Sequence, residues 1–340
     1  MSRRAILAAI AALSVSSPFG VRAQSAPPQP VKAVVADRFP VPFPGGIARL
    51  PIMASVDVSK PQAGVERIVV VLHGASRNAD DYFAYAERAR ANAGTAATLI
   101  VAPQFLVAED AAAHGIDPGT ARWARRDDWP QGVGAAAPGP VTAFGALDAL
   151  LTRFADAQAF PALKAVVVAG HSAGGQLSQR YAAVARADAA LKARGVAVRI
   201  VVANPSSYLW FGAERPYPPA PGACPDYDRW KYGIRGAPPE AGDPATLEAR
   251  YLARDVVYLL GDRDIDPNHS ALDKSCGAMA QGPNRFARGM RFVFDLEGRH
   301  PNLVRHNIFA IQGVAHEASK MLDSTCGRAA LFGAAGCPGF

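Results

Sequence analysis

One serine of this sequence lies in a setting that can make a hydroxyl nucleophilic. The stretch Gly170-His171-Ser172-Ala173-Gly174 directly follows the apolar run 165–169 and directly precedes a segment of helical composition. A Gly-x-Ser-x-Gly sequence between a strand and a helix is typical of a sharp turn that lifts the serine hydroxyl clear of the sheet. Glycines let the helix pass close to the strand. The pattern predicts Ser172 as a nucleophile; the alternative is a glycine-rich turn with a chance serine.

A serine nucleophile needs a general base, and the base needs an acid that fixes its tautomer. In a sheet of parallel strands each should follow a strand, in the order nucleophile, acid, base. The apolar run 256–260 is followed by three carboxylates, at Asp262, Asp264 and Asp266. We expect Asp264 to be the acid, because a Gly-x-x-Asp step lets the chain turn before it presents the side chain. Asp262 and Asp266 remain alternatives.

Among the late histidines, His316 is the expected base. It follows the strand-like run 308–311 after a short turn and precedes a helix-like segment. His300 and His306 lie among arginines and asparagines and are interpreted as surface residues. These placements predict a triad of Ser172, Asp264 and His316.

A second motif could stabilise the negative charge that develops in acyl transfer. The apolar run 68–72 leads into His73-Gly74-Ala75. Two backbone N–H groups must face the oxyanion of the tetrahedral intermediate. Ala173, directly after the serine, is expected to offer one and Ala75 the other. His73 is interpreted as a residue that stabilises the turn.

The acidic segment after residue 260 has a rival interpretation as a calcium loop. Its oxygen-bearing side chains fall at positions 1, 3, 5, 7 and 12 of such a loop, at Asp262, Asp264, Asp266, Asn268 and Asp273. Pro267 stands where the loop needs glycine, and no helix leads into it. Cys-x-x-Cys spacing, which a zinc site would favour, is absent from the sequence. We therefore expect neither a metal nor a cofactor.

The elements that must position these residues are short apolar runs that alternate with helix-like segments. The runs are 68–72, 98–102, 165–169, 200–203 and 256–260, and the helix-like segments are 79–93, 142–157 and 174–187. Continuous apolar runs suit parallel strands that are covered on both faces. The sequence predicts the α/β class, with a mostly parallel central sheet, helices on both faces and one domain over 24–340. Proline-broken runs within 31–58 are expected to be edge strands.

Two long stretches interrupt this alternation. Residues 105–140 read as a loop over the carboxyl edge of the sheet, and about 205–250 form an insertion rich in proline and aromatic residues. Long loops in a compact domain usually cover or shape a site. The aromatic side chains are expected to line a lid or substrate wall, with packing of the insertion onto the domain as the alternative. The candidate substrate contacts are Trp123, Trp129, Tyr208 and Trp210.

The amino-terminal residues resemble an export signal. Arg3 and Arg4 precede the apolar run 6–15, and 21–23 offer a small-x-small cleavage site, so 1–23 are predicted to be a signal peptide. A Sec signal and a twin-arginine signal both fit, and either directs the protein to the periplasm or the medium. In that oxidising setting the cysteines are expected to form two disulfides. The expected pairs are Cys326 with Cys337 and Cys224 with Cys276.

Charge and hydropathy narrow the range of partners. The formal net charge of +7 falls to +4 when the three arginines of the signal peptide are removed. Basic runs of five or more residues are absent from the sequence, so a nucleic-acid partner is not expected. After the signal peptide, every apolar run is shorter than the roughly 18 residues of a spanning helix, so stable membrane insertion is not expected either.

With these residues placed, the region 65–322 resembles the α/β-hydrolase superfamily. Within it, 72–83 carries a His-Gly step followed by Asn-Ala-x-x-Tyr/Phe, and the serine motif ends in Ser-Ala-Gly-Gly. These features are similar to the secreted polyhydroxybutyrate depolymerase and feruloyl esterase-like branch. The resemblance implies hydrolysis of a small or polymeric carboxyl ester without a cofactor. A peptidase, an acyltransferase or a non-catalytic polymer-binding module on the same scaffold are the alternatives.

Overall fold

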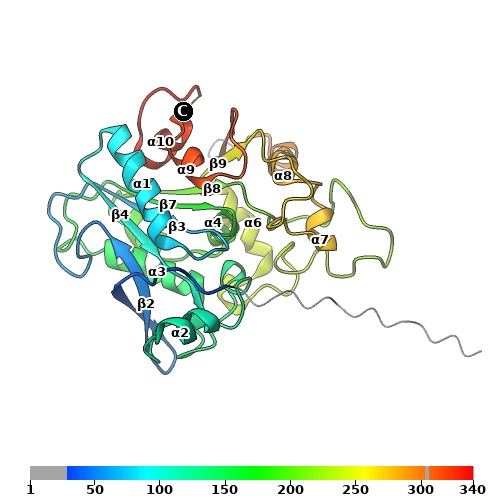
Figure 1. The fold of residues 1–340 in the computed structure, drawn as a ribbon. Coiled ribbons are helices and arrows are strands. Elements are labelled where there is room, and N and C mark those ends of the chain that lie inside the picture. Colours follow the sequence, from blue (N-terminus) through cyan, green and yellow to red (C-terminus); the bar gives the residue numbers. More distant parts are fainter. Residues whose placement is uncertain (1–28, 303–305, 340) are drawn as a thin grey trace, which may run out of the picture.

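The computed structural model describes residues 29–302 and 306–339, and the expected signal peptide, 1–23, lies outside them. Their central feature is an eight-stranded sheet in the order β1-β2-β4-β3-β7-β8-β9-β10 (Figure 1). The strands are β1 (Asp37–Phe43), β2 (Gly46–Ala54), β3 (Arg67–Leu72), β4 (Thr98–Pro103), β7 (Ala165–His171), β8 (Ala197–Ala203), β9 (Asp255–Gly261) and β10 (His306–Ile311). From β4 to β10 all neighbours pair in parallel, which confirms the mostly parallel sheet.

The antiparallel part of the sheet lies at one edge. There β1 pairs with β2, and β2 pairs with β4, both antiparallel. Pro40 and Pro42 lie on β1, the outermost strand. Proline cannot donate to a neighbouring strand, so an edge is the position that tolerates it.

Helices cover both faces of the sheet, as the sequence predicts. One face carries α1 (Ala79–Ala93), α9 (Ala318–Leu322) and α10 (Thr325–Phe332). The other carries α3 (Ala143–Phe154), α4 (Ala173–Val184), α5 (Asp188–Ala193), α6 (Leu247–Leu252) and α8 (Arg285–Arg299). Alternate side chains of a strand point to opposite faces. Along β3, Val69 and Val71 accordingly join one hydrophobic core, and Val70 and Leu72 the other.

The stretch 105–140 differs from the long loop expected there. It contains β5 (Leu106–Val107), α2 (Ala108–His114), β6 (Arg122–Trp123) and the 3-10 helix η1 (Trp129–Gln131). Its organising residue is Asp110, which is fully buried on α2. The Asp110 carboxylate forms an ion pair with Arg77 at 2.7 Å and accepts a hydrogen bond from the Val31 N–H at 2.8 Å. These partners are distant in sequence, so local composition could not indicate them.

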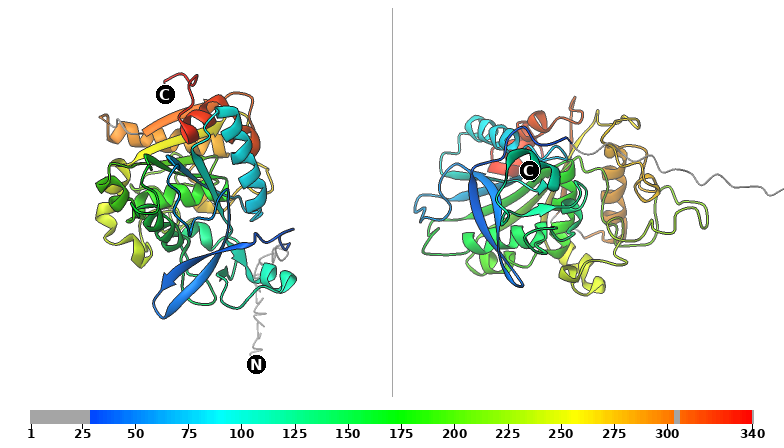
Figure 2. Two further views of the ribbon diagram at one scale, coloured as in Figure 1. Left: turned by 90° about the vertical axis from the view of Figure 1, so that its left-hand side faces the viewer. Right: turned by 60° about the horizontal axis from the view of Figure 1, so that its bottom comes forward.

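The proline-rich insertion is held to the rest of the protein by a disulfide. It runs beside α7 (Cys276–Met279) and α8 and includes the 3-10 helices η2 (Pro239–Ala241) and η3 (Pro244–Thr246) (Figures 1 and 2). Cys224 of the insertion is bonded to Cys276, and Cys326 to Cys337 near the carboxyl end, which are the two expected pairs. Within the described residues, every helix is too short or too polar to cross a membrane.

Candidate active site

Ser172 stands at the turn between β7 and α4. Its backbone has φ 60°, in the left-handed region that only a few non-glycine residues adopt. The glycines around it allow strand and helix to approach closely: a Cβ on Gly170 would lie 2.1 Å from the carbonyl oxygen of Gly174. A side chain at Gly170 would therefore push the helix away from the strand. This turn, residues 170–175, is called the elbow below.

The structure brings the three residues of the predicted triad together, although the chain separates them widely. Nε2 of His316 lies 2.9 Å from Oγ of Ser172, and Nδ1 of His316 lies 2.6 Å from Oδ2 of Asp264. The three side chains follow β7, β9 and β10, so all stand at the carboxyl edge of the parallel strands. An ionised carboxylate can only accept, so Nδ1 donates to Asp264 and Nε2 is free to accept the serine proton. Ser172 can thus lose its proton to His316.

The other two aspartates of the acidic segment have different partners. The Asp262 carboxylate accepts from the Gly313 N–H at 2.8 Å, and the Asp266 carboxylate accepts from the Asn268 N–H at 2.8 Å. Both carboxylates therefore stabilise turns, and Asp264 is the aspartate of this segment that is hydrogen-bonded to His316. The calcium-loop alternative is not supported, because these oxygens and those of Asp264 serve separate partners. No group of three potential metal ligands occurs among residues 29–302 and 306–339.

A buried arginine also binds the acid of the triad. Nη1 of Arg285, at the start of α8, lies 3.2 Å from Oδ1 of Asp264, and both side chains are almost completely buried. The two carboxylate oxygens are thus divided between Arg285 and His316. Burial disfavours the charge on Asp264, but the hydrogen bonds and charges of His316 and Arg285 outweigh it and lower the pKa of Asp264. The carboxylate therefore stays ionised at neutral pH.

Two further imidazoles face the ring of His316. The ring centroid of His171 lies 4.6 Å away, and that of His269 lies 5.1 Å away. Burial lowers the pKa of His316, the hydrogen bond to Asp264 opposes the shift, and the charge of Arg285 adds to it. His316 therefore remains neutral to a lower pH than an exposed histidine. As a neutral imidazole it can act as a base.

Three residues at the site, Arg285, His171 and Tyr82, had no predicted role. His171 occupies the variable position of the Gly-x-Ser-x-Gly motif, and its Nδ1 is hydrogen-bonded to the Tyr82 hydroxyl at 3.2 Å. The Tyr82 hydroxyl also lies so close to Gly74 that a Cβ there would be 2.9 Å from it. Tyr82 thus joins the elbow to the loop after β3. Arg285 had no detectable signal, because it is the first residue of an ordinary amphipathic helix, 21 residues after its partner Asp264.

The loop after β3 is fixed by interactions on both sides. His73 is fully buried; its Nε2 accepts from the Phe105 N–H at 2.9 Å, so its Nδ1 donates to the Gly74 carbonyl at 2.8 Å. Nη1 of Arg77 donates to the Ala75 carbonyl at 3.2 Å. Burial lowers the pKa of His73 to about 4. His73 is thus neutral and occupied with the turn, in line with its interpretation from the sequence.

Ser172 opens into a hollow of about 470 Å³. Ala75 and Ala173, the two expected oxyanion donors, line it together with the serine. Most of the remaining lining is polar: Arg126, Asp127, Pro130, Gln131, Gln176, Ser206, Lys231, Ser270, Ala271, Leu272, Asp273 and Lys274. A second hollow of about 540 Å³ shares Ala75, Arg126 and Ala271 with the first. The hollowed surface therefore extends past the loop after β3 toward α1.

The four aromatic residues expected to contact a substrate lie in the core instead. Trp123, Trp129 and Tyr208 are fully buried, and Trp210 is 2% exposed. Trp129 stacks on Phe105 and packs against His73, and so supports the loop after β3 from the core side. Large aromatic side chains remove much apolar surface from water when they are buried. In this structure the four aromatic side chains pack beneath the site and do not line the hollow.

His300 and His306 also differ in part from their interpretation as surface residues. His300 is half-buried, and its Nε2 is hydrogen-bonded to Oε1 of Glu248 at 3.0 Å. His306 begins β10, and its Nδ1 is hydrogen-bonded to the Tyr258 hydroxyl at 3.0 Å. Burial lowers the pKa of His306 to about 4. The polar sequence around His306 concealed its packing against β9, a neighbour that only the sheet order supplies.

The fold of this chain is similar to that of several solved protein structures. Neither the family models nor the curated proteins gave a match. Among solved structures, the LpqC poly(3-hydroxybutyrate) depolymerase from Bordetella parapertussis is 22% identical, with a TM-score of 0.60 over 89% of this chain and 93% of that one. The poly(aspartic acid) hydrolase-1 from Sphingomonas sp. KT-1 is 21% identical, with a TM-score of 0.58 over 88% of this chain and 100% of that one. The chain has the α/β-hydrolase fold.

The α/β-hydrolase fold explains where the site lies. In open α/β sheets, residues beyond the carboxyl ends of the strands form the ligand crevice. Ser172, Asp264 and His316 all occupy loops of this kind, after β7, β9 and β10. The fold class predicted from the sequence is therefore confirmed, and one of the two neighbours carries the polyhydroxybutyrate depolymerase name of the branch that the chain resembles.

Proposed function

We propose that this protein is an exported serine hydrolase that cleaves carboxyl esters through an acyl-enzyme intermediate. The observation that carries the proposal is the continuous hydrogen-bonded line from Ser172 Oγ through His316 to Asp264, with distances of 2.9 and 2.6 Å. A nucleophile, a base and an orienting acid in contact are the components that acyl transfer requires. The α/β-hydrolase fold and the polyester depolymerase among its structural neighbours support a polymeric ester as one candidate substrate.

In the proposed reaction, His316 Nε2 takes the hydroxyl proton as Ser172 Oγ forms a bond to the ester carbonyl carbon. The carbonyl oxygen becomes an oxyanion, which accepts hydrogen bonds from the Ala75 and Ala173 N–H groups. His316 then gives its proton to the leaving alcohol as the carbon–oxygen bond of the ester breaks. Water attacks the acyl-enzyme in the same manner and releases the acid. Asp264 stays ionised throughout and stabilises the imidazolium.

The proposal is tested by Ser172→Ala with a simple chromogenic ester. Loss of the nucleophile should lower kcat by about 10⁴-fold or more, because the residues of a triad act as a unit. Ser319→Ala is the matched control, since Ser319 lies on α9 and does not line the hollow. Circular dichroism and thermal unfolding should show that both variants remain folded. Turnover retained by Ser172→Ala would refute the assignment.

Two further measurements separate this function from its alternatives. A fluorophosphonate probe should label wild-type protein at Ser172, whereas a non-catalytic polymer-binding module would remain unlabelled. Rates on matched ester and peptide substrates distinguish an esterase from a peptidase. The two disulfides fit the proposed export, because such bonds persist in oxidising compartments.

A further inference from the structure

The hollow at Ser172 has more cationic than anionic side chains in its lining. Arg126, Lys231 and Lys274 are the cations, and Asp127 and Asp273 are the anions. Side chains of one sign around a concave site raise the local concentration of ligands of the opposite sign. The excess of positive charge becomes larger when the buried residues directly behind the lining are included.

Arg180, on α4, is fully buried directly behind the hollow. Its guanidinium donates to the carbonyls of Pro130 and Lys231, at 3.3 and 3.2 Å, and both of these residues line the hollow. Nη2 also donates to the hydroxyl of Ser207, at 3.1 Å. All of these partners are neutral. The positive charge of Arg180 therefore remains close to the hollow without a carboxylate in contact.

Arg288, on α8, holds another part of the lining in the same way. It is fully buried and donates to the carbonyls of Ser206 and Asp273, which both line the hollow. In the described part of the chain, no carboxylate lies within ion-pair distance of Arg180 or Arg288. Burial lowers the pKa of each guanidinium to about 10, so both remain protonated at neutral pH.

One carboxylate, Asp273, is paired with Lys231 and acts on Arg180 and Arg288 from a longer distance. Nζ of Lys231 lies 3.2 Å from Asp273 Oδ2, and the hydroxyl of Tyr232 donates to the same oxygen at 2.8 Å. Burial disfavours the charge on Asp273, but Lys231, Ser275 and Tyr232 lower its pKa to about 2. Asp273 is therefore always ionised. A single negative charge thus faces the positive charges of Lys231, Arg180 and Arg288.

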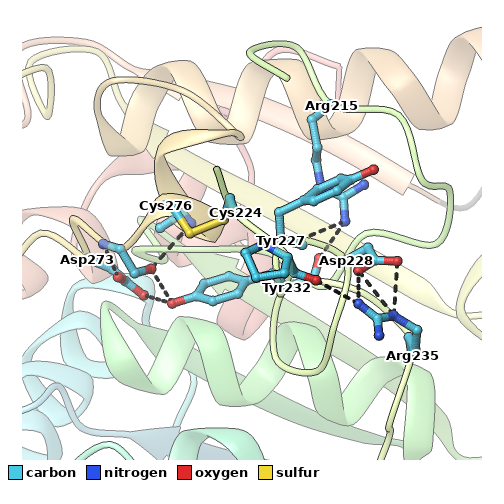
Figure 3. The surroundings of a disulfide bond; sticks show 11 residues. Arg215, Cys224, Tyr227, Asp228, Tyr232, Arg235, Asp273 and Cys276 are labelled. Atoms are coloured by element: carbon cyan, nitrogen blue, oxygen red, sulfur yellow. Dashed lines mark hydrogen bonds and ion pairs between the residues drawn. A yellow bond between two sulfur atoms is a disulfide. The ribbon is translucent and has the colours of Figure 1, made fainter. Parts of the chain in front are cut away.

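Lys231, Tyr232 and Asp273 are called the wall below, and a disulfide fixes them. Figure 3 shows the Tyr232 ring and Asp273 beside the bond between Cys224 and Cys276. Gly277 permits this packing, because a Cβ there would lie 2.4 Å from the Tyr232 ring. The wall therefore does not need to reorganise to present its charge. Binding to a side chain that is already fixed loses less conformational entropy than binding to a mobile one.

The rim of the hollow adds to the imbalance. Among the described residues, Arg126 has no ion pair or hydrogen bond through its side chain, and Nζ of Lys274 donates only to the Asn268 carbonyl, at 3.3 Å. Asp127 is the one acid at the rim without a cationic partner. The adjoining hollow beyond Ala75 also has three cations, Lys32, Arg77 and Arg126, against Asp80 and Asp81, but Arg77 is already paired with the buried Asp110. The positive side of the site is therefore that of Lys231 and Lys274.

We infer that the hollow binds an ester whose acyl or alcohol part carries a carboxylate, and that this carboxylate lies against Lys231 and Lys274 as a further counter-ion. The inference rests on the proposed function and names the substrate class of the same site. An uncharged alkyl group would be a poor occupant, because Leu272 is the only large aliphatic residue among the described residues of the lining. Burial of each methylene against an apolar surface contributes about 0.8 kcal/mol, and a polar lining offers little of it.

The test compares esters that differ only in charge. One pair is the 4-nitrophenyl monoester of adipic acid and 4-nitrophenyl 6-methylheptanoate, in which an isopropyl group replaces the carboxylate. The other pair places the charge in the alcohol: the acetyl esters of 4-hydroxyphenylacetic acid and of its amide. We expect kcat/KM to favour the anionic member of at least one pair about tenfold at low salt. High salt should reduce that ratio, because it screens charges at the rim.

Substitutions of single residues identify the side chains that cause the preference for anionic esters. Lys231→Gln and Lys274→Gln should each lower the ratio of anionic to neutral kcat/KM about threefold. The ratio is the readout, so a general loss of activity cancels. Arg125→Gln is the matched control: Arg125 pairs with Asp128 and does not line the hollow, and the ratio should remain that of the wild type.

The outcomes separate this inference from the proposed function. If Ser172→Ala is inactive and the wild type hydrolyses the neutral esters at least as well as the anionic ones in both pairs, the hydrolase proposal stands and the anionic substrate is refuted. The same conclusion follows if the preference is unchanged in both lysine variants. An anionic preference that falls in those variants and not in Arg125→Gln supports the inference.

Discussion

The elbow and the wall border the same hollow, but they are held by different kinds of contact. In the elbow, the closest contact joins Gly170 to Gly174, within five residues of the chain, and Gly174 and Gly175 also pass close to the ends of the neighbouring strands β3 and β8. In the wall, Lys231 and Tyr232 contact Asp273, more than forty residues away, and a disulfide of sequence separation 52 fixes both segments. The position of Ser172 therefore depends strongly on contacts between residues close together in the chain. The position of the wall depends on contacts between residues far apart in the chain.

The largest effect is expected at the elbow, from Gly170→Ala. The new Cβ would lie 2.1 Å from the Gly174 carbonyl oxygen, a backbone atom that cannot move without the helix. We expect a loss of about 3 kcal/mol or more in the free energy of unfolding, together with almost all esterase activity. Urea unfolding and a chromogenic ester assay measure both losses.

Gly64→Ala is the matched control for this elbow variant. A Cβ at Gly64 would meet no atom within 4 Å, so stability and activity should stay close to those of the wild type. A Gly170→Ala protein as stable as this control would show that the elbow tolerates a side chain.

An intermediate effect is expected at the wall when its disulfide is removed. In the chain-entropy estimate, the pair Cys224→Ser and Cys276→Ser should lose about 4 kcal/mol, and the pair Cys326→Ser and Cys337→Ser about 3 kcal/mol. Only the first bond adjoins residues that line the hollow. We therefore expect both double variants to unfold at lower urea, and only the first to change the ratio of anionic to neutral kcat/KM. If the ratio of anionic to neutral kcat/KM is the same in both double variants, the bond between Cys224 and Cys276 does not position the wall.

The smallest effect is expected at Arg285, which supports the triad from outside both regions. His316 has a lowered pKa, so activity should be retained above that pKa and be lost as pH falls through a value below 6.5. Arg285→Gln removes a positive charge beside Asp264, so the pKa of His316 should rise and the acid limb of kcat/KM should move up by about one pH unit. Profiles of kcat/KM against pH measure the shift.

Arg285→Lys provides the charge-matched control. It retains a cation beside Asp264, so its acid limb should stay near that of the wild type. An unmoved limb in Arg285→Gln would mean that Arg285 holds Asp264 in place without affecting the base. The profile thus distinguishes an electrostatic from a purely structural role.

Much of the fold could be predicted because its signals are local. The run 256–260 is apolar throughout and became β9, and Pro40 and Pro42 marked an edge strand that became β1. The stretch 105–140 was less predictable, since α2 depends on Asp110 and its contact with Arg77, 33 residues earlier. Trp123 and Trp129 were expected to face a substrate and are buried, because aromatic residues in a loop-like sequence look the same in either setting.

The sequence by itself determined the elbow, the apolar runs that form the parallel strands and the residue types available for a triad. Those features depend on backbone sterics and on apolar patterning, which act over a few residues. Only the tertiary structure decided that Asp264, and not Asp262 or Asp266, contacts His316, and that Arg285 binds the same carboxylate. It also decided that Arg180 and Arg288 stand behind the hollow without a carboxylate partner in the described residues. Charge interactions depend on distance in space and on burial, and neither quantity can be read along the chain.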